Sequence, residues 1–341
     1  MNHSSTPDRK GGRTAILAIS RTSNLPTFQS IRRSKTSVSS LNLLNSEIYH
    51  NKLGVKISEM KTLFAYLELT RPLNGIIAFI SAWLGGMFAS QDTIQNLVDI
   101  RLWLVSIAAF IMLSAGNAIN DYSDYNIDQI NRPRRPLPSG RIRRVDALIF
   151  AVILVAIGIY LGTLINRNAT AIAILVFAAL ATYARWLKRI PFVGNLVVSS
   201  LTGLTFISGG IAIDSVQGTL IPAIFAFLFT TAREIIKDLE DTEGDLKNSV
   251  KTLAILNPQL AVKTAIGFMG LVILFSPIPY LFSGYSWHYL LAVVLGVDLV
   301  LIGCAIRLLR DASKESCTAI QRWMKWDIFV GLGAIYLGTF L

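Results

Sequence analysis

The 341-residue chain contains few of the side chains that form disulfides and zinc sites. It has two cysteines, Cys304 and Cys317, from which no disulfide framework can be argued. Its three histidines, His3, His50 and His288, lie far apart, and none has a spaced partner that would predict a zinc site or a catalytic dyad. The chemistry of this protein therefore has to be sought among its other polar residues.

Charged residues are also scarce. They make up 16% of the chain, against about a quarter in ordinary globular proteins, whereas hydrophobic residues make up 52%. Apolar stretches of roughly 20 residues, the length that spans a bilayer, recur along the chain. They cover residues 72–90, 102–120, 145–165, 169–187, 193–213, 217–236, 260–282, 287–308 and 323–341. The sequence therefore predicts an all-α fold, a multi-pass membrane bundle of about nine transmembrane helices.

Two of these predicted helices depend on single breaks in the sequence. Only the polar residues 166–168 separate the third stretch from the fourth, so the count is eight or nine. Pro277 and Pro279 interrupt the seventh stretch, and no charged residue lies near them in the sequence.

The chain has 32 lysines and arginines but only 21 aspartates and glutamates, which gives a net charge of +11. Such a charge could suggest nucleic acid, but the basic residues gather in every second connection, above all residues 132–144, 185–189, 237–251 and 310–325. This is the positive-inside pattern of membrane proteins. It predicts an integral protein of the cell membrane with these connections and the N-terminus in the cytosol, and it gives no sign of a nucleic-acid or protein partner.

Residues 1–59 differ in composition from the predicted membrane domain at residues 60–341. The first 46 positions hold seven basic residues, ten serines and one acidic residue, Asp8, a composition typical of an organelle transit peptide. Two other interpretations stay open, a disordered cytosolic tail and a start of translation at Met60. A transit peptide would direct the protein to an organelle membrane.

Two acidic clusters lie at the cytosolic ends of predicted helices. In a helix with about 100° per residue, the polar residues of each cluster fall within one stripe roughly 60° wide. The first stripe contains Asn117, Asp121, Asp124 and Asp128, and the second contains Glu234, Asp238, Asp241 and Asp245. One such run could be a solvated helix end, but two of matching design at the same side indicate a site. Because Mg²⁺ binds a few carboxylates together with substrate phosphates, we predict a site for Mg²⁺ and a diphosphate.

Basic residues that could complete a phosphate site follow the first cluster and the fourth predicted helix. Arginine matches phosphate oxygens in a bidentate fork, and lysine acts as a point charge. The candidates for substrate binding are Asn120, Arg132, Arg135, Arg141, Tyr183, Lys188 and Arg189. For each basic residue alone, the simpler interpretation is an orientation signal.

The segments NDYSDYNID and NRPRRPLPSG, a Lys-Arg pair after Tyr183, and a second acidic motif resemble the UbiA-type intramembrane prenyltransferases over residues 65–341. The resemblance implies that an isoprenyl diphosphate binds through Mg²⁺ and that its prenyl group is transferred to a lipophilic acceptor. It implies metal ligation by Asn120, Asp121, Asp124, Asp128, Asp238, Asp241 and Asp245, with Asp124, Asp128, Asp238 and Asp245 as the catalytic acids. The spacing of the second motif leaves open whether Glu240 or Asp241 is its middle acid.

The loop sequences are similar to the branch of this family that adds a second geranylgeranyl chain to geranylgeranylglyceryl phosphate in ether-lipid synthesis. A phosphorylated acceptor would account for additional arginines in residues 132–141. Two alternatives stay open, an aromatic, quinone or chlorophyllide acceptor and, from another class, a membrane transporter. Six aromatic residues could shield a carbocation from water. They are Phe79, Trp83, Tyr122, Tyr125, Tyr183 and Phe206.

Overall fold

The computed structural model describes residues 59–89, 98–247 and 250–340, and this part of the chain is helical, with no strand among the described residues. The basic segment 1–58, for which several interpretations were open, lies outside the described residues. Residues 60–341 form a compact unit of their own. The predicted all-α multi-pass membrane bundle is confirmed.

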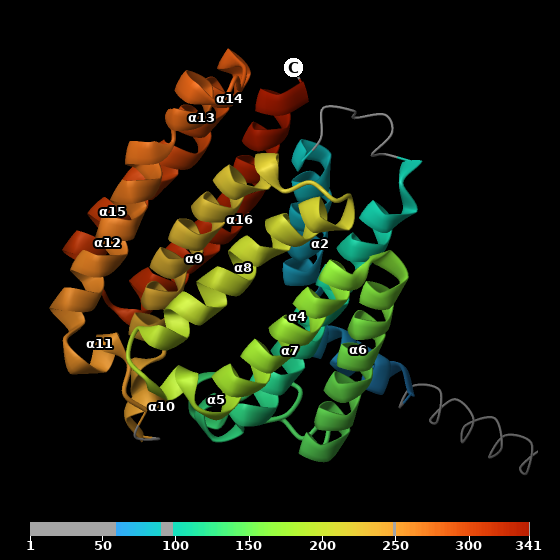
Figure 1. The fold of residues 1–341 in the computed structure, drawn as a ribbon. Coiled ribbons are helices and arrows are strands. Elements are labelled where there is room, and N and C mark those ends of the chain that lie inside the picture. Colours follow the sequence, from blue (N-terminus) through green and yellow to red (C-terminus); the bar gives the residue numbers. More distant parts are fainter. Residues whose placement is uncertain (1–58, 90–97, 248–249, 341) are drawn as a thin grey trace, which may run out of the picture. The chain divides into compact units, whose positions relative to one another are not determined.

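The long helices correspond closely to the predicted apolar stretches (Figure 1). A helix over residues 59–70 precedes α2 (Pro72–Ala89), α4 (Ile100–Ser123), α6 (Arg144–Ile165), α7 (Arg167–Arg185), α8 (Val193–Ala212) and α9 (Leu220–Glu240). The C-terminal part contains α12 (Pro258–Phe275), α13 (Ile278–Phe282), α14 (Trp287–Ala292), the π-helix η3 (Val293–Asp298), α15 (Leu299–Arg310) and α16 (Lys314–Phe340). Short helices α5 (Tyr125–Asn131), η1 (Leu187–Arg189), η2 (Gln217–Thr219), α10 (Thr242–Lys247) and α11 (Leu253–Leu256) lie in the connections.

Local sequence signals explain where several helices begin. Pro72 and Pro258 occupy first positions of their helices, where the missing N–H has no cost. Asn166 separates α6 from α7 and caps α7, because its side chain accepts a hydrogen bond from the backbone N–H of Ala169 at 2.8 Å. The break that the sequence placed between the third and fourth stretches is therefore real.

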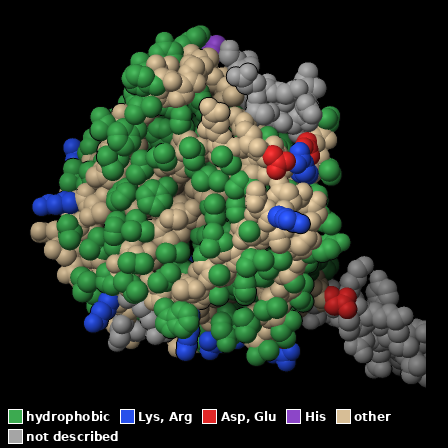
Figure 2. All heavy atoms as spheres, viewed as in Figure 1, with side chains coloured by type: hydrophobic (Ala, Val, Ile, Leu, Met, Phe, Trp, Pro, Cys, Tyr) green, Lys and Arg blue, Asp and Glu red, His purple; other side chains and the backbone are tan. Residues whose placement is uncertain are grey.

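Within the described residues, eight helical segments are long and apolar enough to cross a membrane. The ninth long helix, α16, begins nine residues before the predicted stretch at 323, and its first half carries charged residues such as Lys314 and Arg322. The count of about nine is thus confirmed. Hydrophobic side chains cover most of the visible face of the bundle, and Lys and Arg gather along the edge near α5 and α10 (Figure 2).

The proline break in the seventh segment faces a charge that sequence proximity did not reveal. Asp298, at the end of the π-helix, accepts a hydrogen bond at 2.7 Å from the hydroxyl of Ser276, the residue before Pro277. The expectation of a charge-free break was wrong, because α12 and η3 pack against each other although 22 residues separate these two side chains.

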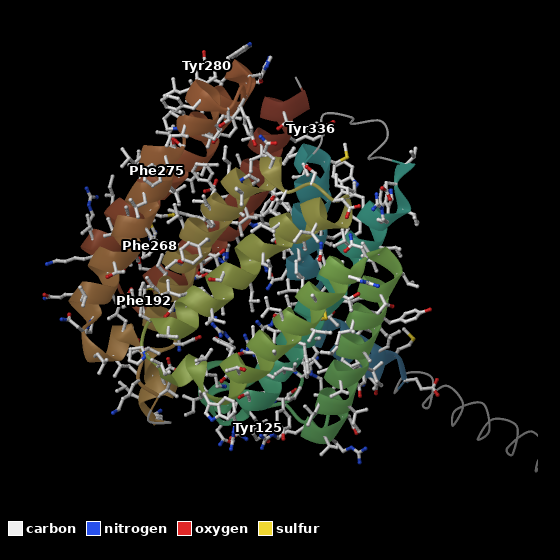
Figure 3. The ribbon with its side chains drawn as sticks, in the orientation of Figure 1. Tyr125, Phe192, Phe268, Phe275, Tyr280 and Tyr336 are labelled. Carbon is white, nitrogen blue, oxygen red and sulfur yellow. The ribbon has the colours of Figure 1, made fainter. Side chains whose placement is uncertain are left out.

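Glycines allow α2 and α8 to approach closely. A Cβ atom on Gly85 would overlap the carbonyl oxygen of Phe206, and one on Gly209 would overlap that of Ala82. Small residues at such crossings favour close packing of membrane helices. In Figure 1, α5, α10 and α11 lie together at one end of the bundle. Tyr125 marks this end in Figure 3, whereas Tyr280 and Tyr336 lie near the opposite end.

Candidate active site

The first acidic motif spans a break between two helices. Helix α4 ends at Ser123, Asp124 adopts φ −91° and ψ 12°, and α5 continues the chain. Asp121 and Asp128 are almost fully buried, with 2% and 3% of their surface exposed. The prediction assumed one continuous helix, but the break still leaves the three aspartates near one another, since Arg135 contacts both Asp121 and Asp128.

Each aspartate of the first motif has a cationic partner. Arg135 contacts Asp128 at 2.6 Å and Asp121 at 3.2 Å, and Arg71 pairs with Asp121 from the start of α2. Lys188 pairs with Asp124 and also donates to the hydroxyl of Ser123 at 2.6 Å. Buried charges are costly unless they are paired, so these contacts stabilise the motif inside the bundle.

The second motif repeats the helix break of the first. Helix α9 ends at Glu240, Asp241 adopts φ −90° and ψ 5°, and α10 follows. Asp241 pairs with Arg132 at 3.0 Å, whereas Glu240 accepts a hydrogen bond from Thr318 of α16 at 2.9 Å and lies 3.9 Å from Arg132. Glu240 is therefore turned toward α16, and Asp241 faces the loop of the first motif.

One asparagine joins the two motifs. The side chain of Asn131 donates to the carbonyl of Asp241 at 3.0 Å and accepts from the backbone N–H of Gly244, also at 3.0 Å. A Cβ atom on Gly244 would overlap the Asn131 amide, so glycine permits this approach. Asn131 thus fixes the distance between α5 and α10, the helices that carry Asp128 and Asp245.

The remaining acids of the second motif are less neutralised. Asp238 accepts a hydrogen bond from the Asn195 amide at 2.8 Å. Asp245 is 6% exposed and has no ion-pair partner among the described side chains. Burial, together with the negative charges of Asp241 and Asp124, raises the pKa of Asp245 to about 7. Burial also raises the pKa of Asp128, although Arg135 opposes that rise.

These residues suit a magnesium ion that arrives with a phosphate ligand. Within the described chain, no three His, Cys, Asp or Glu side chains already form a metal cluster, since most of the acids contact basic groups instead. However, the Oδ1 atom of Asn120 is buried without a hydrogen-bond partner. Asp245 makes no ion pair with a described side chain, although the charges of Lys237 and Arg132 attract it. Oxygen ligands of this kind are those that Mg²⁺ prefers, with phosphate oxygens completing its coordination.

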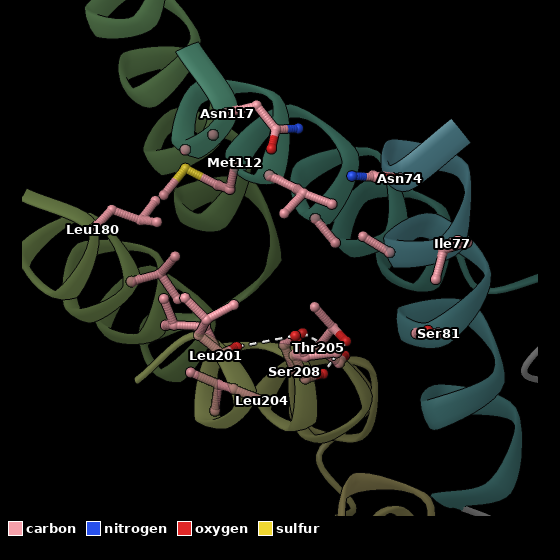
Figure 4. Close-up of a pocket in the computed structure, with 18 of the residues that line it drawn as sticks. Asn74, Ile77, Ser81, Met112, Asn117, Leu180, Leu201, Leu204, Thr205 and Ser208 are labelled. Atoms are coloured by element: carbon pink, nitrogen blue, oxygen red, sulfur yellow. Dashed lines mark hydrogen bonds between the residues drawn. The ribbon is translucent and has the colours of Figure 1, made fainter. Parts of the chain in front are cut away.

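A cavity of about 270 Å³ begins beside this charged region and extends into the bundle. Asn117, Asn120, Tyr183 and Glu234 line its polar end. Figure 4 shows its apolar part, where Ile77 and Ser81 of α2 face Leu180 and Leu201 from the opposite side.

The hydroxyl groups that α8 presents to the apolar part bond to carbonyl groups of the same helix. Thr205 donates to the carbonyl of Thr202 at 2.6 Å, and Ser208 donates to the carbonyl of Thr205 at 2.7 Å (Figure 4). Both hydroxyl groups therefore already donate their hydrogen bond to the backbone of α8. The wall behaves as an apolar surface, which suits a hydrocarbon chain and excludes water.

The sequence matches the profile of the UbiA prenyltransferase family over residues 78–329. This chain belongs to the UbiA prenyltransferase family. The predicted resemblance to that family is confirmed.

Relatives in this family share most of their length with the chain. It is 37% identical to digeranylgeranylglyceryl phosphate synthase of Methanosphaera stadtmanae over 275 residues, which cover 80% of this chain and 98% of the relative. It is 39% identical to the enzyme of the same name from Thermococcus kodakarensis over 280 residues, covering 81% and 98%. A solved structure of digeranylgeranylglyceryl phosphate synthase is 34% identical, with a TM-score of 0.64, and covers 82% of this chain and 98% of its own. A UbiA homologue from Archaeoglobus fulgidus bound to GPP and Mg²⁺, 17% identical with a TM-score of 0.56, shares the fold over 80% and 99%.

The UbiA fold brings together many, but not all, of the residues that the sequence singled out. Tyr183 lines the cavity, and Lys188, Arg132 and Arg135 contact the acids. Arg141 instead points to the surface, where it pairs with Glu68 at 2.6 Å. The side chain of Arg189 lies outside the part that the structure describes.

Most of the six aromatic candidates lie away from the cavity. Tyr183 is the one among them that lines it. The guanidinium of Arg144 lies over Tyr122 and Tyr125, 5.0 and 4.7 Å from their ring centres. Trp83 packs against Trp103 instead. The cavity is enclosed by aliphatic rather than aromatic side chains.

The sequence interpretation missed other polar residues of the site. Arg71, Arg233 and Lys325 line the cavity, and Asn131 and Asn195 contact the second motif. The pair Arg71-Pro72 at the start of a span was a usable signal, since proline marks a helix start. Arg233 and Asn131 lie beside the acidic motifs in the sequence, but nothing in their spacing singles them out. Asn195 and Lys325 lie on other helices, α8 and α16.

Proposed function

We propose that this UbiA-family enzyme transfers a geranylgeranyl group from geranylgeranyl diphosphate to geranylgeranylglyceryl phosphate and releases diphosphate. The observation that carries the proposal is the position of two acidic motifs at the polar end of an apolar cavity within a membrane bundle. The names of the relatives at 37% and 39% identity support the acceptor and a role in ether-lipid synthesis.

The metal is Mg²⁺ in this proposal, and its ligands come from both motifs. The candidate ligands are Asn120, Asp121, Asp124, Asp128, Asp238, Asp241 and Asp245. Bound Mg²⁺ would stabilise the negative charge that develops on the departing diphosphate. The Mg²⁺ bound with GPP in the Archaeoglobus fulgidus homologue is consistent with this fold holding such a pair. For the middle acid of the second motif, the contact between Asp241 and Arg132 favours Asp241 over Glu240.

The basic residues have two roles before and after the donor binds. Lys188, Arg132 and Arg135 neutralise the acids in the described structure. With the acids holding Mg²⁺, these side chains would be free to donate hydrogen bonds to phosphate oxygens, and hydrogen bonds to a charged phosphate are strong. Tyr183 lines the same polar end of the cavity, where the proposal places the donor phosphates.

The reaction exchanges one carbon–oxygen bond for another. The bond between the allylic carbon and the diphosphate breaks, a glycerol oxygen of the acceptor bonds to that carbon, and the hydroxyl proton passes to the released diphosphate or to water. The apolar cavity holds the prenyl chain and keeps water from the allylic carbon, while the fixed position of both substrates reduces the entropic part of the barrier.

We place the acids on the cytosolic side of the cell membrane. The argument is the concentration of basic residues in the connections at this end, which the positive-inside rule assigns to the cytosol. Attachment of an enzymatic tag next to α10 and to the loop before α14, read in intact cells, tests this orientation.

A donor assay with a panel of acceptors tests the function. Purified protein with radiolabelled geranylgeranyl diphosphate and Mg²⁺ is expected to label geranylgeranylglyceryl phosphate, and chelator is expected to stop the reaction until Mg²⁺ is restored. Efficient labelling of a quinol or chlorophyllide instead would assign the chain to another branch of the family. Absence of diphosphate release with every acceptor would count against prenyl transfer.

A further inference from the structure

Four basic side chains line the cavity from elements that carry no aspartate of the first motif. One of them, Lys237, pairs with Glu234 at 2.6 Å, and the other three are Arg71, Arg233 and Lys325. Arg71 precedes α2, Arg233 lies in α9 and Lys325 lies in α16. Helix α16 packs against both α9 and α2, so the three side chains share one side of the cavity. Arg233 and Lys325 differ from Arg132 and Arg135, which are paired with the acidic motifs, whereas Arg71 pairs with Asp121 of the first motif.

Two of these three cations, Arg233 and Lys325, have no ion pair among the described residues. The Nε atom of Arg233 is buried without a hydrogen-bond partner. Lys325 experiences the positive charges of both Arg233 and Arg71, and no ion-pair partner for it or for Arg233 lies among the described residues. Glu234 and Glu240 both attract Arg233, but the carboxylate of Glu234 is held by Lys237 at 2.6 Å and that of Glu240 accepts a hydrogen bond from Thr318 at 2.9 Å. Such mutual repulsion in a partly buried space favours the binding of an anion.

The backbone holds these residues in place. Arg71 has a φ of 51°, in the left-handed region that residues other than glycine rarely adopt, because the chain turns there between two helices. The side chain of Gln321, one turn before Lys325 in α16, donates to the backbone carbonyl of Arg233. This bond fixes α16 against α9 at the level of the two cations.

We propose that Arg71, Arg233 and Lys325 bind the phosphate group of the acceptor lipid. The inference rests on the proposed function, and it assigns the acceptor phosphate to this cluster rather than to the arginines of residues 132–141. A phosphate monoester carries nearly two negative charges and several acceptor oxygens, which suit two guanidinium groups and one ammonium group.

The cluster adjoins the donor site without coinciding with it. Arg71 pairs with Asp121 of the first motif, so the acceptor phosphate and the metal-bound diphosphate lie at the same end of the cavity. Arg233 and Lys325 have no such contact with a motif aspartate, and they therefore separate recognition of the acceptor from recognition of the donor.

Direct binding of the acceptor to the full-length protein tests the cluster. Purified protein in lipid nanodiscs is titrated, without donor, with geranylgeranylglyceryl phosphate and with the same lipid lacking its phosphate. The wild type is expected to bind the phosphorylated lipid at least about ten-fold more tightly, the effect of one charge-assisted hydrogen bond. Lys325→Gln and Arg233→Gln are expected to lose about ten- to a hundred-fold of that affinity and to leave binding of the unphosphorylated lipid unchanged.

Arg322→Gln is the matched control, because Arg322 lies three residues from Lys325 on the same helix but is exposed and does not line the cavity. Arg233→Lys retains the charge and is expected to keep part of the affinity for the phosphorylated lipid. It replaces Arg233→Gln in the test if that variant folds poorly. Equal binding of both lipids by the wild type would overturn the proposal. Equal losses for both lipids in the variants, or the same loss in Arg322→Gln, would also overturn it.

A turnover measurement separates this inference from the proposed function. In the Lys325→Gln variant, the KM for the phosphorylated acceptor is expected to rise while the KM for geranylgeranyl diphosphate stays constant. A rise in the donor KM instead would overturn the acceptor assignment and leave prenyl transfer intact. Phosphate-selective binding without any transfer by the wild type would refute the proposed function and leave the lipid-phosphate site standing.

Discussion

The two acidic motifs have the same backbone design and different electrostatic surroundings. Each consists of a long helix that ends at an aspartate, Asp124 or Asp241, with nearly equal dihedral angles, followed by a short helix. Every aspartate of the first motif is paired with Arg or Lys, whereas Asp245 of the second has no ion-pair partner among the described residues. The first motif is therefore balanced before a ligand binds, and the second retains negative charge that a bound cation would relieve.

The largest expected effect is the loss of turnover when an aspartate of either motif is removed. An equal loss for both motifs would show that the charge-paired first motif is as necessary as the second. Asp128→Ala and Asp245→Ala are each expected to lower kcat by at least about a hundred-fold, because the departing diphosphate loses charge stabilisation. Glu243→Ala is the control, since this exposed residue of α10 has Lys247 as its ion-pair partner among the described residues. Turnover by Asp128→Ala within a few-fold of the wild type would contradict the role of the first motif.

The two adjacent acids at the break of the second motif can be separated. Asp241→Asn is expected to lower activity by about ten-fold or more, because Asp241 faces Arg132 and the first motif. Glu240→Gln is expected to have a small effect on turnover, because its carboxylate bonds to Thr318. Steady-state kinetics of both variants check this expectation, and the reverse order of effects would make Glu240 the working acid.

The unpaired second motif predicts a pH dependence. Asp245 has a pKa of about 7, so it is protonated below that pH and must lose a proton to bind Mg²⁺. The apparent affinity for Mg²⁺ is expected to rise as pH increases through 7, by about ten-fold per unit below 7 for one proton. Titration of activity with Mg²⁺ between pH 6 and 8 measures this effect. A slope that persists unchanged in Asp245→Asn would assign the proton to another group.

The connection between the motifs predicts a smaller effect. Asn131→Ala removes two hydrogen bonds worth about 1 kcal/mol each, so the KM for Mg²⁺ is expected to rise by about ten-fold or somewhat more. The variant is expected to remain folded, with a melting temperature close to that of the wild type in thermal unfolding. Asn257→Ala is a suitable comparison, because Asn257 also makes a side-chain hydrogen bond to backbone but only caps α12. An equal change in both variants would indicate general destabilisation.

The smallest effect is expected at Arg141, which the sequence placed among the substrate ligands. Its partner Glu68 lies at the surface, and an exposed ion pair contributes about 0–1 kcal/mol. Arg141→Ala is therefore expected to change the KM for either substrate by less than about five-fold. A large and selective rise in the acceptor KM would return the acceptor phosphate to the loop of residues 132–144.

The sequence by itself determined the fold class and the chemical character of the site. Long apolar stretches cannot satisfy their backbone groups in lipid except as helices, and they therefore predicted the positions of most spans, although α16 begins nine residues before its predicted stretch. The acids of each motif lie together as predicted, although the helix breaks at an aspartate. The short helix after the break keeps the next acid at the same end of the bundle. Asp124 and Asp241 thus hold equivalent positions that the spacing alone only partly revealed.

Only the tertiary structure decided which charges meet. Arg71 and Asp121 are 50 residues apart, and Lys188 and Asp124 are 64 apart, so no local pattern relates them. The same holds for Arg141, which resembles its neighbour Arg135 in the sequence but points to the surface. Helix packing sets these contacts, because a side chain's partner depends on the crossing of whole helices rather than on its own spacing. The periodicity of a sequence determines which face of a helix is polar, and the packing of the other helices determines what that face contacts.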